Sequence, residues 1–142
     1  MDLSYKVKVE EIVNEWAPVI MDELKYSLED NGKDTNMLLE CTVIVSDGME
    51  YCRDTDREIL GWYKLGRYGT ENKIELFWRN FRDLSSGPDK LAIIHTLAHE
   101  YRHCYQTEYY SFEEMDSIGY REAREADANN FANLIRMLAQ DK

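Results

Sequence analysis

The apolar residues of this 142-residue chain change their spacing along the sequence, and this change restricts the fold more than any other feature. Over residues 5–29 they recur at every third or fourth position, which predicts an amphipathic helix with Pro18 as a kink or a break. Residues 30–34 are expected to end that helix, with Gly32 in a C-cap or a turn. The first part of the chain is therefore predicted to be helical.

The middle of the chain has the composition of strands. Residues 37–45, 59–65 and 73–78 contain β-branched runs or alternating polar and apolar residues, both of which favour strands. The link between the second and third of these segments is short, which predicts that they form an antiparallel hairpin.

Two further helices are predicted in the last third of the chain. The first covers about residues 90–108, and the second runs from residue 115 or 120 to about residue 139. The order helix, three strands, helix, helix indicates an α+β fold with a small, mostly antiparallel sheet. The length fits a single domain over residues 1–142.

Acidic residues exceed basic ones by 28 to 17, which gives a formal net charge of −11. This balance argues against nucleic acid or an anionic membrane surface as a partner, because both need a basic face. No apolar run has the length of a membrane span or of a secretory signal. Cys41, Cys52 and Cys104 form no CxxC pair and are expected to be reduced thiols, so the sequence predicts a cytoplasmic protein.

Two of only three histidines stand in the motif HExxH, at His99 and His103, inside the predicted helix. Residues four apart on a helix lie about 40° from each other, so both imidazoles can reach one metal ion from the same face. Glu100 lies about 100° further round, beside such an ion, where it can act as a general base toward water. The alternative is an internal helix that carries two surface histidines and a chance glutamate.

A catalytic zinc ion needs a third protein ligand. His95 extends the stripe of His99, but residues eight apart lie about 12 Å apart along the axis, so His95 is expected to be packed or to support a ligand. The last helix offers Glu122, Glu125 and Asp127. Glu125 and Asp127 lie about 200° apart on the helical wheel, so only one is expected to reach the metal, and the apolar arc slightly favours Asp127.

The combination of HExxH with a following Glu-x-x-x-Asp/Asn helix resembles the gluzincin arrangement of thermolysin-like peptidases. It is more similar to small zincins of the ImmA/IrrE type and to related phage-encoded metallopeptidases, over about residues 61–138. The second helix of that group carries a Glu-x-x-Ala-Asn-x-Phe-Ala-like string, which residues 125–132 match. The resemblance implies a minimal zincin-like fold, Glu125 as the third ligand in preference to Asp127, and Asn129 as the support of a metal-binding histidine.

Together these features predict a zinc-dependent endopeptidase that acts on a protein or peptide substrate. Zinc is the metal expected for histidine and glutamate ligands. Backbone of the substrate is expected to pair with an exposed strand edge at residues 73–77. The oxyanion needs a donor besides the metal, and the candidate side chains are Tyr109, Tyr110, Tyr120, Arg102 and Arg121.

Two other classes of protein compete with this prediction. A zincin-fold binding or regulatory protein would hold zinc structurally and would use a fourth protein ligand, such as Cys104 or Asp127. Another zinc hydrolase, such as an amidase, is the third possibility, and the signature of the zinc deaminases is absent from the sequence.

Overall fold

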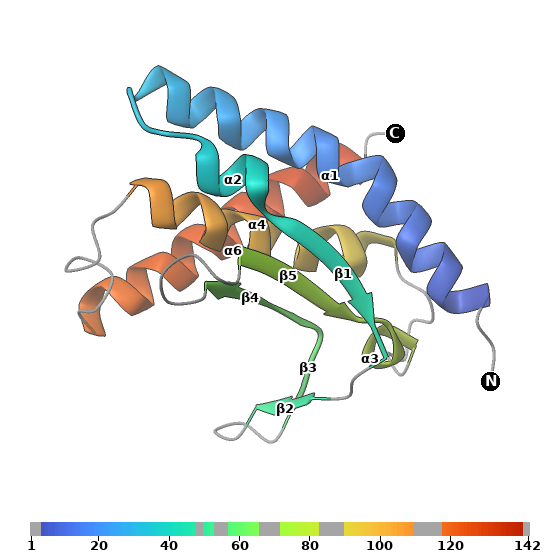
Figure 1. The fold of residues 1–142 in the computed structure, drawn as a ribbon. Coiled ribbons are helices and arrows are strands. Elements are labelled where there is room, and N and C mark those ends of the chain that lie inside the picture. Colours follow the sequence, from blue (N-terminus) through green and yellow to red (C-terminus); the bar gives the residue numbers. More distant parts are fainter. Residues whose placement is uncertain are drawn as a thin grey trace.

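The computed structural model describes residues 4–47, 50–52, 57–65, 72–82, 90–109 and 118–140, which form the α+β fold that the sequence predicts (Figure 1). The helices are α1 (Ser4–Asp30), α2 (Asn36–Glu40), α3 (Trp78–Arg82), α4 (Lys90–Tyr109) and α6 (Ile118–Gln140). The strands are β1 (Thr42–Ser46), β2 (Glu50–Cys52), β3 (Arg57–Ile59), β4 (Gly61–Leu65) and β5 (Asn72–Phe77). Helices α4 and α6 lie within a few residues of their predicted bounds.

The sheet has three strands in the order β1-β5-β4, so β5 is central. The β4–β5 pair is antiparallel, with Tyr63 opposite Ile74, as the short link between the strands predicts. Strand β1 runs parallel to β5, with Val43 opposite Ile74, so the sheet is mixed rather than mostly antiparallel. The connection between β1 and β5 explains this parallel pairing. Between these two strands the chain passes through the antiparallel β2–β3 ribbon and β4, so it enters β5 in the same direction as β1.

Three local features differ from the sequence prediction. Residues 36–40 form helix α2 instead of strand, and the backbone N–H of Asn36 donates to the carboxylate of Asp34 at its start. Trp78 begins α3 instead of ending β5, and its buried indole N–H donates to Asp47 Oδ1 at 2.5 Å. The β2–β3 ribbon was not predicted at all.

Helix α1 runs through Pro18 without a break. Its buried side chains recur every three or four residues and lie in the core: Val9, Val13, Trp16, Ile20, Leu24 and Leu28. Packing of this face on α4 continues on both sides of the proline, which keeps the helix intact although Pro18 donates no hydrogen bond. Gly32 follows the helix with a φ of 69°, a left-handed conformation that suits glycine after a helix end.

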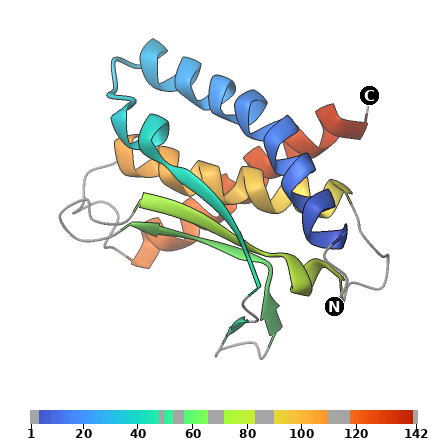
Figure 2. The same cartoon turned by 45° about the vertical axis from the view of Figure 1, so that its right-hand side comes forward.

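Helix α4 lies at the centre of the molecule. It contacts α1, α2, α6 and strands β4 and β5, and Figure 2 shows it between α1 and the sheet. Its inward side chains Ile93, Ile94, Leu97 and Ala98 are fully buried. Any side chain that α4 directs toward α6 is therefore held by a helix packed on several sides.

Within the described residues, no helix is both long and apolar enough to cross a membrane.

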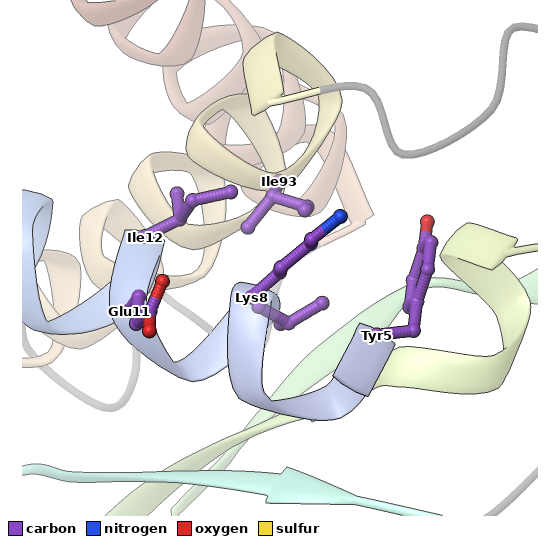
Figure 3. A pocket seen from close by; sticks show the side chains of 6 residues that line it. Tyr5, Lys8, Glu11, Ile12 and Ile93 are labelled. Atoms are coloured by element: carbon purple, nitrogen blue, oxygen red, sulfur yellow. The ribbon is translucent and has the colours of Figure 1, made fainter. Parts of the chain in front are cut away.

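A pocket of about 320 Å³ lies where the first turns of α1 approach α4 (Figure 3). The lining side chains are those of Tyr5, Lys8, Val9, Glu11, Ile12 and Ile93. Ile93 lies six positions before His99, and no histidine or cysteine lines this pocket. It is therefore separate from the histidine motif.

At Gly61 strand β4 packs closely against α4, and a side chain at this position would collide with its neighbours. A Cβ atom would lie 2.7 Å from Leu76 Cδ2, 2.9 Å from the carbonyl oxygen of Glu75 and 3.1 Å from Thr96 Cγ2. We predict that Gly61→Ala lowers the free energy of unfolding by about 1–3 kcal/mol, because backbone or helix must shift. Urea denaturation measures this change. The exposed substitution Ala123→Ser is the control, and an equal stability of both variants would contradict the close packing of β4 on α4.

Candidate metal centre

Helices α4 and α6 bring two imidazoles and one carboxylate together. His99 and His103 lie one turn apart on α4, with their rings edge to face and their Nε2 atoms 3.1 Å apart. Glu125 reaches across from α6, with Oε2 at 3.3 Å from His99 Nε2 and Oε1 at 3.1 Å from His103 Nε2. The structure thus brings Glu125, and not Asp127, against both histidines.

The spacing of these three side chains is close to that of a tetrahedral metal site. Ligand atoms bound at about 2.0–2.2 Å to one tetrahedral zinc ion lie roughly 3.3 Å from each other. The two Nε2 atoms lie 3.1 Å apart, and the two oxygens of Glu125 lie 3.3 Å (Oε2) from His99 Nε2 and 3.1 Å (Oε1) from His103 Nε2. Two imidazole nitrogens with one carboxylate oxygen are also a ligand set that zinc uses in catalytic sites. The residues present therefore fit a zinc ion.

The hydrogen bond at His103 Nδ1 determines which of the two ring nitrogens carries the hydrogen. His103 Nδ1 lies 3.0 Å from Gln106 Oε1, and Gln106 Nε2 donates to the carbonyl oxygen of Arg124 and to Asp127 Oδ2, each at 2.9 Å. Because Gln106 directs its amide nitrogen at these two acceptors, its oxygen faces the imidazole and accepts from Nδ1–H. His103 Nε2 then carries a lone pair toward the site.

Asp127 lies on the same helix as Glu125 but makes different contacts. Arg102 of α4 donates to it twice, from Nε at 2.8 Å and from the guanidinium NH₂ at 3.1 Å, and Gln106 adds a third hydrogen bond. Burial raises the pKa of Asp127, but the bonds from Arg102 and Gln106 outweigh burial and hold that pKa below its ordinary value. Asp127 therefore joins the two helices beside the imidazoles.

The carboxylate of Glu125 is held in its charged form by the two histidines. When the imidazoles are protonated, hydrogen bonds from His103 and then from His99 lower the pKa of Glu125 well below the ordinary range, although partial burial acts in the opposite direction. About half of the Glu125 side chain remains exposed, whereas each imidazole is largely covered. The site therefore opens on the side of Glu125.

Glu100 lies inside the protein, next to the same imidazoles. Its side chain has one ligand atom within 4.8 Å of those of His99 and His103. Burial raises its pKa to about 8, while His99 lowers it, Glu125 raises it and a hydrogen bond from the backbone of Tyr63 lowers it. A carboxyl with such a pKa can both accept and donate a proton near neutral pH.

The hydrogen bond from Tyr63 comes from the side of β4 that pairs with no other strand in the described residues. Phe77 N donates to Leu60 O, so in the antiparallel β4–β5 ladder the backbone groups of Trp62 and Lys64 face β5. Those of Tyr63 point the other way, toward Glu100. The prediction that residues 73–77 offer an exposed edge is wrong, because β5 is paired on both sides, with β1 and with β4.

Other residues named by the sequence lie away from the three ligand atoms. His95 is on α4, and burial, followed by the charges of His99 and of Arg136 on α6, lowers its pKa. Asn129 is exposed on α6, and His103 Nδ1 donates to Gln106 Oε1 instead. Cys104 is buried and its thiol donates to Asn72 Oδ1 at 3.8 Å. Tyr110 and the side chains of Tyr109 and Tyr120 fall outside the described residues.

Gln106 is the residue that the sequence prediction missed. Its position three residues after His103 places it on the same side of α4, which is a local signal that the sequence does contain. Its contacts with Arg124 and Asp127 come from the other helix and depend on how α6 packs.

No family model matches this chain, and searches of curated proteins and of solved structures found no match. The function is therefore inferred from the residues and contacts of the chain itself.

The geometry predicts which carboxylate binds metal. Glu125→Ala should weaken zinc binding by more than about 100-fold, which exceeds the usual effect of residues that only support a ligand. Competition with a chromogenic chelator measures the Kd, and elemental analysis measures the stoichiometry. Glu122→Gln is the matched control, because Glu122 is an exposed acid one turn earlier on α6. Wild-type affinity in Glu125→Ala, with loss of zinc in Asp127→Ala, would reverse the assignment.

Proposed function

We propose that this chain is a zinc-dependent metallopeptidase of the gluzincin type that cleaves peptide bonds in a protein or peptide substrate. One observation carries the proposal: the carboxylate of Glu125 meets both Nε2 atoms of HExxH at the spacing of tetrahedral ligands, next to buried Glu100. His99, His103 and Glu125 would hold the metal, and Glu100 would move the proton.

Zinc at these residues would supply a Lewis acid for the scissile carbonyl and would make water acidic enough to attack near neutral pH. Glu100 takes a proton from the attacking water as the C–O bond forms, and gives it to the amide nitrogen as the C–N bond breaks. The raised pKa of Glu100 supports both steps, because the charged and the protonated carboxyl are both accessible near neutral pH. A cation bound beside it would lower that pKa.

The free edge of β4 is the place where this chain can hold an extended substrate. Within the described residues β4 pairs with β5 alone, so the backbone groups of Gly61 and Leu65 face outward like those of Tyr63. A peptide added at this edge would lie next to Glu100, because the Tyr63 N–H already bonds that carboxyl. Strand β4 therefore replaces residues 73–77 as the proposed substrate edge.

The main alternative is a binding or regulatory protein with a structural zinc, which needs a fourth protein ligand. The two residues expected to supply it make other contacts in the described part of the chain. Asp127 is paired with Arg102 and Gln106, and Cys104 is directed toward Asn72. These contacts leave the fourth position to water or substrate and favour a hydrolase.

We also propose a cytoplasmic location and no nucleic-acid or membrane partner. Cys41 and Cys104 are buried and form no disulfide, and a hydrogen bond with Cys104 raises the pKa of Cys41. Neighbouring thiols that are not joined in a disulfide are typical of a reducing compartment. The net charge of −11 repels polyanions.

Removal of the general base gives the direct test of this function. Glu100→Gln should retain zinc but lower peptide cleavage by about 10²–10⁴-fold, the usual contribution of general acid–base catalysis. New termini in a library of unstructured peptides, read by mass spectrometry, measure the rate. Glu122→Gln should cleave like the wild type. Equal rates in wild type and Glu100→Gln, or a zinc-loaded wild type that leaves every peptide intact, would contradict the proposal.

A further inference from the structure

A chain of charged and polar contacts runs from α4 to α6 and back to the proposed ligands. Arg102 donates twice to Asp127, Asp127 accepts from Gln106, and Gln106 accepts from His103. Gln106 is only 1% exposed, so its hydrogen bonds cannot be replaced by bulk water. Arg102, Asp127 and Gln106 are called the positioning cluster below.

The amide of Gln106 can take only one orientation in this setting. Rotation of the amide by 180° would turn its oxygen toward the carbonyl oxygen of Arg124 and the carboxylate of Asp127, where no donor would be left between them. The observed orientation leaves one acceptor for His103, which must then carry its hydrogen on Nδ1. The hydrogen-bond partners on α6 thus decide which nitrogen of His103 is free to bind metal.

The guanidinium of Arg102 is also held from two directions. It lies 4.0 Å from the ring centre of Tyr105 on α4 and 5.2 Å from that of Phe131 on α6. The bidentate bond to Asp127 requires the planar fork of arginine, which lysine does not provide. The guanidinium therefore holds the turn of α6 that carries Asp127 against the turn of α4 that carries Arg102.

The contact between Arg102 and Asp127 lies next to the proposed metal ligands on both helices. Asp127 lies two positions after Glu125, and Arg102 is adjacent to His103. The Glu125 side chain is 55% exposed, so packing of its own does little to hold it against the imidazoles. The bond between Arg102 and Asp127 fixes the turn of α6 that carries Glu125.

We propose that Arg102, Asp127 and Gln106 are positioning residues that prepare two of the three zinc ligands, by directing the lone pair of His103 and by placing Glu125. This inference rests on the proposed zinc site. It adds that the affinity of the site depends on contacts between α4 and α6, made by residues that are not metal ligands.

Zinc affinity of purified full-length variants tests the inference without any substrate. Gln106→Met keeps the side-chain volume and removes all three hydrogen bonds, so it should weaken zinc binding about ten- to hundredfold. Asp127→Asn and Arg102→Lys should weaken it in the same direction, and Glu122→Gln should not. Circular dichroism confirms folding. Wild-type Kd values in Gln106→Met and Asp127→Asn would overturn the inference.

A second readout follows the tautomer of His103 in metal-free protein. With ¹⁵N-labelled histidine at alkaline pH, where imidazoles are neutral, the wild type should show a protonated Nδ1 and a lone pair on Nε2 of His103. Gln106→Met should show a mixture of tautomers. The same single tautomer in both proteins would overturn the role of Gln106.

The two readouts separate this inference from the peptidase proposal. Zinc that binds tightly and weakens as predicted, in a protein that cleaves no peptide, would contradict the peptidase and leave the positioning cluster in place. Peptide cleavage that depends on Glu100, with zinc affinity insensitive to Gln106 and Asp127, would do the reverse. A wild-type chain that binds no zinc would overturn both.

Discussion

The packing of α6 along α4 is the contact on which the rest of the site depends. Helix α4 alone supplies two imidazoles one turn apart, which is what the spacing of HExxH dictates. The third group, Glu125, lies on α6, more than twenty residues after His103. It meets both rings only because the two helices are held in a fixed position along each other. The Arg102–Asp127 pair and the hydrogen bonds of Gln106 to α6 join the two helices there.

Burial of α4 determines the chemistry of Glu100. The helix is packed between α1, α6 and the sheet, so the carboxyl of Glu100 is removed from water and the pKa of Glu100 is raised. Within the described residues, a backbone donor on the outer side of β4 reaches this carboxyl. Glu100, the proposed proton carrier, therefore lies near both the imidazoles and the proposed substrate edge.

The sequence predicted those parts of the fold that local spacing controls. The three-to-four spacing of buried residues in α1, and the apolar flanks of the histidine motif in α4, are properties of single segments. The parallel pairing of β1 with β5 was not predictable in this way, because it depends on the detour through the β2–β3 ribbon. The helix at residues 36–40 begins at Asn36, which donates to the carboxylate of Asp34 from its backbone and from its side chain.

The choice between Glu125 and Asp127 shows the same limit. The helical wheel ranks residues by their side of the apolar arc, and it placed Asp127 slightly closer to the core. It carries no information about Arg102 on another helix, which occupies the carboxylate of Asp127. The family resemblance favoured Glu125, which the structure does place at the imidazoles, but it also pointed to Asn129, which is exposed. Gln106 was readable from its spacing to His103, and its partners were not.

A crystal structure of the zinc-soaked protein, with anomalous data on both sides of the zinc absorption edge, tests the central claim most directly. The account predicts one strong anomalous peak within about 2.0–2.2 Å of His99 Nε2, His103 Nε2 and one oxygen of Glu125, with no fourth protein ligand. A peak coordinated by Asp127 or Cys104, or no peak between α4 and α6, would contradict it.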